Sequence, residues 1–129
     1  MFTTKSLIAA AAAAATLAAM PAAAQADAVR YAHTPSGNIT CRANRSPVYG
    51  WSLVCTVADP GLTMRISDDG YAYESAYKRI AKRGRTLEYG HVYTLGDFRC
   101  ESTESELTCS RDRDEGYLLL SRENSSAVN

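Results

Sequence analysis

The stretch NITCRANRSPVYGWSLVCTV (residues 38–57) decides the fold of this chain, because it holds two alternating segments around a turn. In each segment apolar side chains or a cysteine alternate with polar ones, which is the pattern of a half-buried β-strand. Pro47 and Gly50 suit the connection between the segments. The positions that would face the core are Ile39, Cys41, Ala43, Trp51, Leu53, Cys55 and Val57. The sequence therefore predicts an antiparallel hairpin with a cysteine on each strand.

The two cysteines of this hairpin also predict its register. In an antiparallel pair the sum of opposed residue numbers is constant, so placing Cys41 opposite Cys55 fixes every other pair. The neighbours on the same face are then Ile39 with Val57, Ala43 with Leu53, and Arg45 with Trp51. A disulfide between Cys41 and Cys55 thus agrees with the hydrophobic pattern without any shift.

The last third of the chain repeats this pattern. Residues 98–102 and 107–111 alternate around a polar turn, and residues 117–121 form a third apolar segment, which predicts a three-stranded meander with Cys100 opposite Cys109. Four cysteines allow three connectivities. The pairing 41–55 with 100–109 is favoured because both bonds are local and face the core. Closing loops of this length stabilises a domain by about 3 kcal/mol per bond.

A helix is expected between the two hairpins. The spacing of Tyr73, Tyr77 and Ile80 places them on one helical face. Asp69 can accept hydrogen bonds from the first turn. The pattern therefore predicts one short helix at about 71–83.

Three more short segments complete the fold prediction. Residues 62–66, 85–88 and 91–95 alternate as short strands do. The chain is therefore expected to be mainly β: a small, disulfide-stapled antiparallel sheet or sandwich-like domain with a single short helix.

The N-terminal residues have the layout of a secretory signal peptide. Lys5 supplies a positive charge, an alanine-rich apolar run follows, Pro21 ends it, and Ala24 and Ala26 are small residues at the positions that a signal peptidase reads. The apolar run is shorter than the ~20 residues that a membrane-spanning helix needs. We predict cleavage near Ala26, export to the periplasm or the medium, and a single domain over residues 27–129 without a transmembrane segment.

The composition argues against several classes of function. The chain carries 14 basic and 14 acidic residues, and this balance argues against a dedicated nucleic-acid binder, which needs a basic face. All four cysteines lie in the exported part, where an even count is typical of disulfides. No C-x2-C pair is present, and His33 and His91 lack a partner at ligand spacing. The sequence predicts no metal, cofactor or catalytic residue.

Several short motifs resemble a bacterial family of small secreted proteins known only as a domain of unknown function. The matching residues are the opening Pro35, Ser36, Gly37, Asn38, Ile39 and Cys41, the central Tyr89, Gly90, Gly96, Phe98, Cys100, Thr108 and Cys109, and the closing Gly116, Tyr117, Ser121 and Arg122. The resemblance implies secretion, two disulfides and a mostly β domain, and it supplies no reaction, substrate or partner. Family members often carry a further cysteine pair, and a G-H-G-F where this chain has residues 114–117.

A cluster of positive charges is the best candidate for a binding surface. Five cations fall within eight residues, namely Lys78, Arg79, Lys82, Arg83 and Arg85. On the expected helix, Lys78, Lys82 and Arg85 share one face, and separated charge steers a protein towards a charged partner. We therefore expect a non-catalytic binding or structural module that meets an anionic envelope component or protein.

The sequence also allows three other interpretations. The basic cluster is also what an ordinary solvated helix face looks like. The small, stapled domain suits a secreted enzyme inhibitor. A small secreted hydrolase would use His33 or His91 as acid or base, although nothing in the local sequence fixes their geometry.

Overall fold

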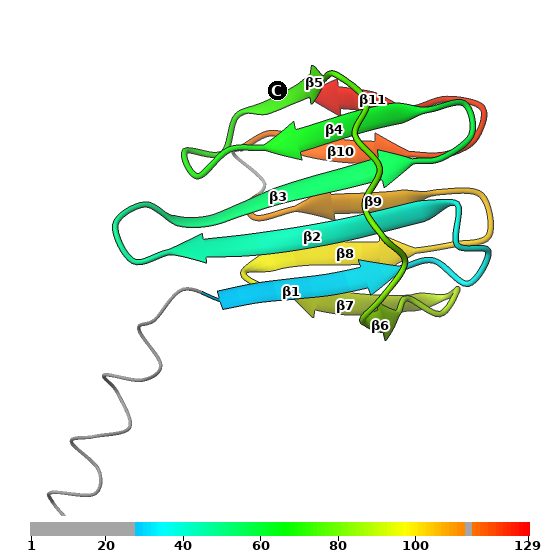
Figure 1. Cartoon of the computed structure of the whole chain (residues 1–129), viewed down its shortest axis with the longest axis horizontal. Helices are drawn as coiled ribbons and strands as arrows, with labels where there is room; N and C mark the ends of the chain where they lie inside the picture. The colour runs from blue at the N-terminus through cyan, green and yellow to red at the C-terminus, as the bar shows by residue number, and fades with distance from the viewer. Residues whose placement is uncertain (1–27, 113–114) are drawn as a thin grey trace, which may run out of the picture.

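The protein is a sandwich of two facing β-sheets (Figure 1). The structure, a computed structural model, describes residues 28–112 and 115–129. The predicted signal peptide, residues 1–26, lies outside the described residues. Within them the chain is mainly β, as the alternating sequence predicts.

The first sheet, sheet A, contains six strands. Their order across the sheet is β5 (Ala72–Ser75), β4 (Leu62–Ile66), β3 (Gly50–Val57), β2 (Ile39–Ser46), β1 (Ala28–His33) and β6 (Arg85–Thr86). Neighbouring strands are antiparallel, except that the two-residue β6 runs parallel to β1. The predicted segment 85–88 thus forms a strand over only its first two residues.

The second sheet, sheet B, is a five-stranded antiparallel meander. Its order is β11 (Ser126–Val128), β10 (Tyr117–Leu120), β9 (Leu107–Ser110), β8 (Phe98–Ser102) and β7 (His91–Leu95). The expected three-stranded C-terminal meander is confirmed as β8–β10. The strands β7 and β11 extend it at either edge.

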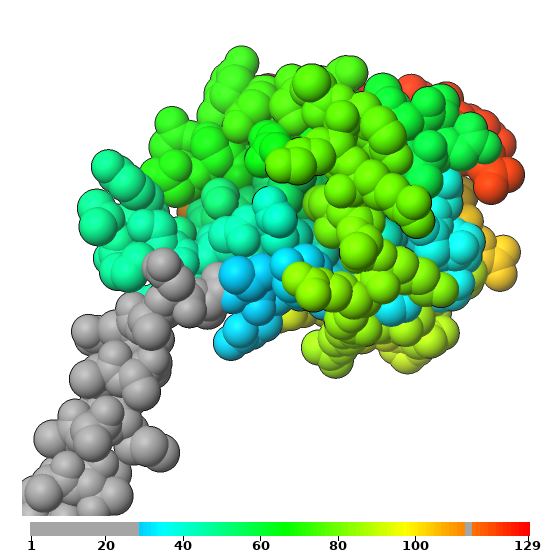
Figure 2. Space-filling model, in the orientation of Figure 1, coloured from blue at the N-terminus to red at the C-terminus, as the bar shows by residue number. Residues whose placement is uncertain are grey.

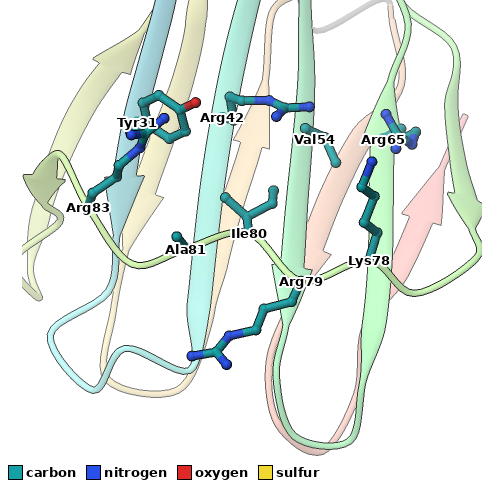
Figure 3. Close-up of a pocket in the computed structure, with 9 residues that line it drawn as sticks. All are labelled: Tyr31, Arg42, Val54, Arg65, Lys78, Arg79, Ile80, Ala81 and Arg83. Carbon is teal, nitrogen blue, oxygen red and sulfur yellow. The ribbon is translucent and has the colours of Figure 1, made fainter.

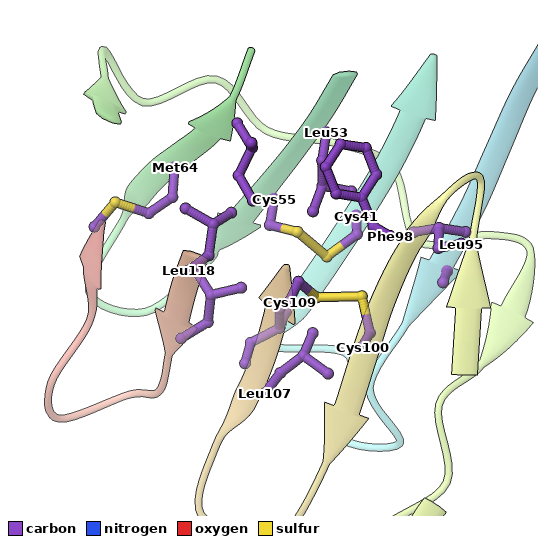
Figure 4. Close-up of a cluster of buried hydrophobic side chains, with 14 of the residues drawn as sticks. Cys41, Leu53, Cys55, Met64, Leu95, Phe98, Cys100, Leu107, Cys109 and Leu118 are labelled. Carbon is purple, nitrogen blue, oxygen red and sulfur yellow. A yellow bond between two sulfur atoms is a disulfide. The ribbon is translucent and has the colours of Figure 1, made fainter. Parts of the chain in front are cut away.

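The predicted register and disulfides are both confirmed. Cys41 lies opposite Cys55 in β2–β3, Cys100 lies opposite Cys109 in β8–β9, and each pair is bonded. The sulfur atoms of Cys41, Cys55 and Cys109 all lie within 4.8 Å of one another. The two disulfides therefore stack against each other between the sheets (Figure 4), where Phe98 and Leu53 pack beside them.

The predicted helix at about 71–83 is wrong. Residues 72–75 form β5 instead, paired with β4, and no helix occurs in residues 28–112 and 115–129. A short helix gains its stability from an apolar face packed on the core. Of the expected face only Ile80 is buried, while Tyr73 and Tyr77 are exposed. The same described part of the chain contains no helix that could span a membrane.

Candidate anion-binding site

Residues 76–84, called the strap below, cross the outer face of sheet A (Figures 1 and 2). Threonine hydroxyls on that face hold it down. Thr63 Oγ1 accepts from the Lys78 amide at 2.9 Å, and Thr40 Oγ1 donates to the Ile80 carbonyl at 3.1 Å. Because these side chains satisfy backbone groups of the strap, the segment can stay extended without forming a helix.

The far end of the strap is fastened by a buried histidine. His33 Nδ1 lies 3.2 Å from the Arg83 carbonyl oxygen, which can only accept, so Nδ1 donates. In the neutral ring His33 Nε2 then accepts from Thr86 Oγ1 at 3.0 Å. Gly84 follows with a φ of +80°, and a Cβ there would collide with the backbone of Tyr31. This end of the strap therefore depends on both a histidine and a glycine.

Beside the strap, the strand registers bring four side chains into one row on the outer face. Tyr31 lies opposite Arg42, Arg42 opposite Val54, and Val54 opposite Arg65. Residues that are directly opposed in a sheet point to the same side. The row therefore crosses β1 to β4 next to the strap.

The row and the strap together enclose a pocket of about 190 Å³ (Figure 3). Its lining residues are Tyr31, Arg42, Val54, Arg65, Lys78, Arg79, Ile80, Ala81 and Arg83. In Figure 3 the charged ends of Arg42, Arg65 and Lys78 gather around Val54, whereas Arg79 points away on the other side of the strap. The pocket thus has an apolar floor and a cationic rim.

The cations of this pocket have no acidic partner among the described residues. None of its lining residues is Asp or Glu, and none of the ion pairs in the described ranges involves Arg42, Arg65 or Lys78. Arg65 Nε donates to Ser75 Oγ at 2.9 Å, which fixes the direction of its guanidinium. Arg42 Nε is buried and is without a hydrogen-bond partner in the described part of the chain. Most buried hydrogen-bond donors in proteins have a hydrogen-bond partner.

Tyr31 lies beside two of the cations of the pocket. The guanidinium of Arg83 lies over the Tyr31 ring, with its Cζ atom 3.7 Å from the ring centroid. Hydrogen bonding to Arg83 and Arg42, together with their charge, lowers the pKa of the Tyr31 hydroxyl. A site that favours a phenolate also favours other oxyanions.

The structure brings together only part of the predicted basic surface. Lys78, Arg79 and Arg83 line the pocket, but Lys82 lies beside Gly37, and Arg85 lies over the ring of Tyr93 instead. The expected shared face of Lys78, Lys82 and Arg85 is therefore wrong, because it required the helix.

Two residues of the site were missed from the sequence. Arg42 and Arg65 occupy outward-facing strand positions and meet only through the β2–β3–β4 register. The outward direction of Arg42 follows from the alternation around Cys41. Its closeness to Arg65 requires the position of β4, which the sequence does not supply.

The two histidines have different surroundings in the structure. His33 is buried and holds the strap, while His91 is exposed on β7 opposite Ser102. Neither lies in the lining of the cationic pocket. The described residues therefore show no acid–base pair built from these two side chains.

Comparison with known proteins identifies no relative. No family model, no curated protein and no solved structure matches this chain. The two disulfides alone indicate an oxidising environment such as the extracellular space.

Proposed function

We propose that this protein is a non-catalytic binding module that captures an anionic partner in the pocket beside the strap. One observation carries the proposal: Arg42, Arg65 and Lys78 converge on a recess without an acidic side chain among the described residues that line it. Like charges held close together repel one another. An incoming oxyanion relieves this repulsion and accepts charge-assisted hydrogen bonds from the guanidinium and ammonium groups of the pocket.

The shape of the site favours recognition over simple charge screening. Guanidinium groups bind carboxylate, sulfate and phosphate oxygens through two parallel hydrogen bonds. Val54 is only 3% exposed at the floor of the pocket, so the cations stand around a partly desolvated surface. Interactions at such a surface are screened less by salt than those between fully exposed charges.

The proposal includes export of the protein from the cell. A signal peptide over residues 1–26, cleavage near Ala26 and release to the periplasm or medium agree with the two disulfides. The resemblance to secreted bacterial proteins leads in the same direction. The partner would then be an anionic component of the cell envelope or its surroundings.

The test is an NMR titration of the oxidised protein with sodium sulfate at constant ionic strength. We expect amide shifts centred on Tyr31, Val54 and Lys78. A variant that combines Arg42→Gln, Arg65→Gln and Lys78→Gln should bind sulfate at least about tenfold more weakly, because charge-assisted hydrogen bonds are lost. Lys78→Gln alone repeats the test with a substitution that lies outside the β-strands.

The control variant combines Lys82→Gln, Arg99→Gln and Arg122→Gln, which removes the same charge outside the pocket. It should bind sulfate within about twofold of the wild-type affinity, because these exposed charges lie outside the pocket and are screened by solvent and salt. Equal losses in both variants would show that only net charge matters. Absence of any shift in the wild-type protein would also overturn the proposal.

A further inference from the structure

The cationic pocket is one end of a longer groove on the outer face of sheet A. A second hollow of about 200 Å³ shares Val54 and Arg65 with the pocket. A third hollow of about 400 Å³ shares Asn44, Ser52 and Asp68 with the second. The three hollows therefore adjoin one another between the strap and the tip of the β2–β3 hairpin.

The chemistry of the groove changes along its length. The end beside the strap is lined by Arg42, Arg65 and Lys78. The next part is lined by the polar side chains of Asn44 and Ser52, and by Asp68, whose carboxylate accepts hydrogen bonds and repels anions. A ligand that fills both parts must carry its negative charge at one end and neutral hydrogen-bonding groups at the other.

Aromatic rings stand at the side of the second hollow. Tyr73 lines it and stacks on Tyr71, with their ring centroids 6.3 Å apart. Tyr73 is 38% exposed and Tyr71 is 58% exposed. A tyrosine offers a flat apolar face and a polar end, which matches a sugar ring, since its C–H groups form an apolar face while its hydroxyls project from the rim.

An extended peptide fits this groove less well than a sugar does. Peptides commonly bind sheets along an edge, where backbone groups are unpaired. This groove lies across the face of β2, β3 and β4, whose backbone groups are engaged in the strand ladders. Only side chains are available here, and they match hydroxyl groups on one side and an oxyanion on the other.

From these features we infer that the partner is an acidic oligosaccharide in which a charged sugar adjoins a neutral one. Its carboxylate or sulfate occupies the pocket of Arg42, Arg65 and Lys78. The adjoining neutral sugar hydrogen-bonds to Asn44 and Ser52 and covers the face of Tyr73. The inference rests on the proposed function and adds the class of partner to it.

The experiment compares four probes of similar length by titration calorimetry: a hyaluronan tetrasaccharide, a tetragalacturonate, a tetraglutamate peptide and neutral chitotetraose. Hyaluronan alternates charged and neutral sugars, so it should bind at least about tenfold more tightly than the other three. Tyr73→Leu and Asn44→Ala, made separately, should each weaken hyaluronan binding at least about threefold and leave sulfate binding unchanged.

Tyr117→Leu supplies the matched control, because Tyr117 lies on the outer face of sheet B with the same exposure of 38%. It should leave hyaluronan binding unchanged. Equal or tighter binding of tetraglutamate or tetragalacturonate would overturn the saccharide inference, and so would insensitivity to both groove substitutions. Sulfate binding that is lost only in the pocket variant would still support the anion-binding function in either case.

Discussion

The outer faces of the two sheets differ although their inner faces are built alike. Sheet B presents Arg99 and Glu101 side by side on β8, with 3.9 Å between nitrogen and oxygen. Sheet A presents Arg42 and Arg65 on one row, and the strap adds Lys78. Sheet B thus balances its charge locally, while sheet A concentrates charge of one sign beneath a crossing segment.

This difference separates the residues that the fold requires from those that are available for binding. Each inner face contributes one disulfide and a set of alternating apolar residues to a single core. Sheet B shows that such a face folds with an ordinary mixed exterior. The uncompensated charge of sheet A therefore adds nothing that the core needs, which supports a role in binding.

The largest effect is expected from removing the disulfides, which tests the likeness of the two inner faces. Replacing Cys41 and Cys55 by alanine should lower the free energy of unfolding by about 3 kcal/mol, and so should replacing Cys100 and Cys109, because the closed loops are of similar length. Denaturant unfolding of both variants measures this. A loss confined to one pair would mean that the two sheets do not share one core.

A smaller effect is expected from Ile80→Ala, which tests whether the strap is what makes the outer face of sheet A differ from that of sheet B. Ile80 is the buried side chain of the strap, and its truncation should lower stability by about 2 kcal/mol and weaken sulfate binding. Leu119→Ala, at a half-buried position on the outer face of sheet B, is the control. It should cost less than about 1 kcal/mol and leave sulfate binding unchanged. Thermal unfolding and the NMR titration report both quantities, and unchanged sulfate binding in Ile80→Ala would show that the strap does not shape the site.

The strap also shows where sequence-based prediction succeeded and failed. The hairpins β2–β3 and β8–β9 were predicted down to individual pairs, because alternation and local cysteines fix a register within a few residues. The strap was predicted as a helix, because its helical spacing is equally local. Its actual conformation depends on Thr40, Thr63 and His33, which belong to other parts of the chain.

The candidate site was predicted only in part for the same reason. Lys78, Arg79 and Arg83 were found because they cluster in the sequence. Arg42 and Arg65 are 23 positions apart, and neither is unusual in its own strand. A site built across strands becomes visible only when the register of three strands is known.

The side chain of Arg111 links the two sheets and gives a pH-dependent test of their connection. Arg111 follows β9 of sheet B and donates to the backbone carbonyls of Trp51, at 3.3 Å, and Asp68, at 2.8 Å, in sheet A and the turn beyond it. It also donates to the Glu115 carboxylate through Nε and Nη2, at 3.0 and 2.7 Å. These hydrogen bonds lower the pKa of Glu115.

The smallest effect is expected from titrating this junction. A carboxyl group whose pKa is lowered by folding contributes stability above its unfolded pKa, here 4.5, and loses it as pH falls through the folded value. Glu115→Gln should therefore cost about 1 kcal/mol or less at pH 7 and flatten the decline below pH 4.5. Burial raises the pKa of Asp97, so this carboxyl group has the opposite effect: its protonation stabilises the folded protein as pH falls. Asp97→Asn removes that gain and should make the loss of stability with falling pH steeper. Denaturant unfolding between about pH 3 and 7 separates the two signs, and parallel curves for the wild type and Glu115→Gln would show that Arg111 holds the sheets together without this carboxylate.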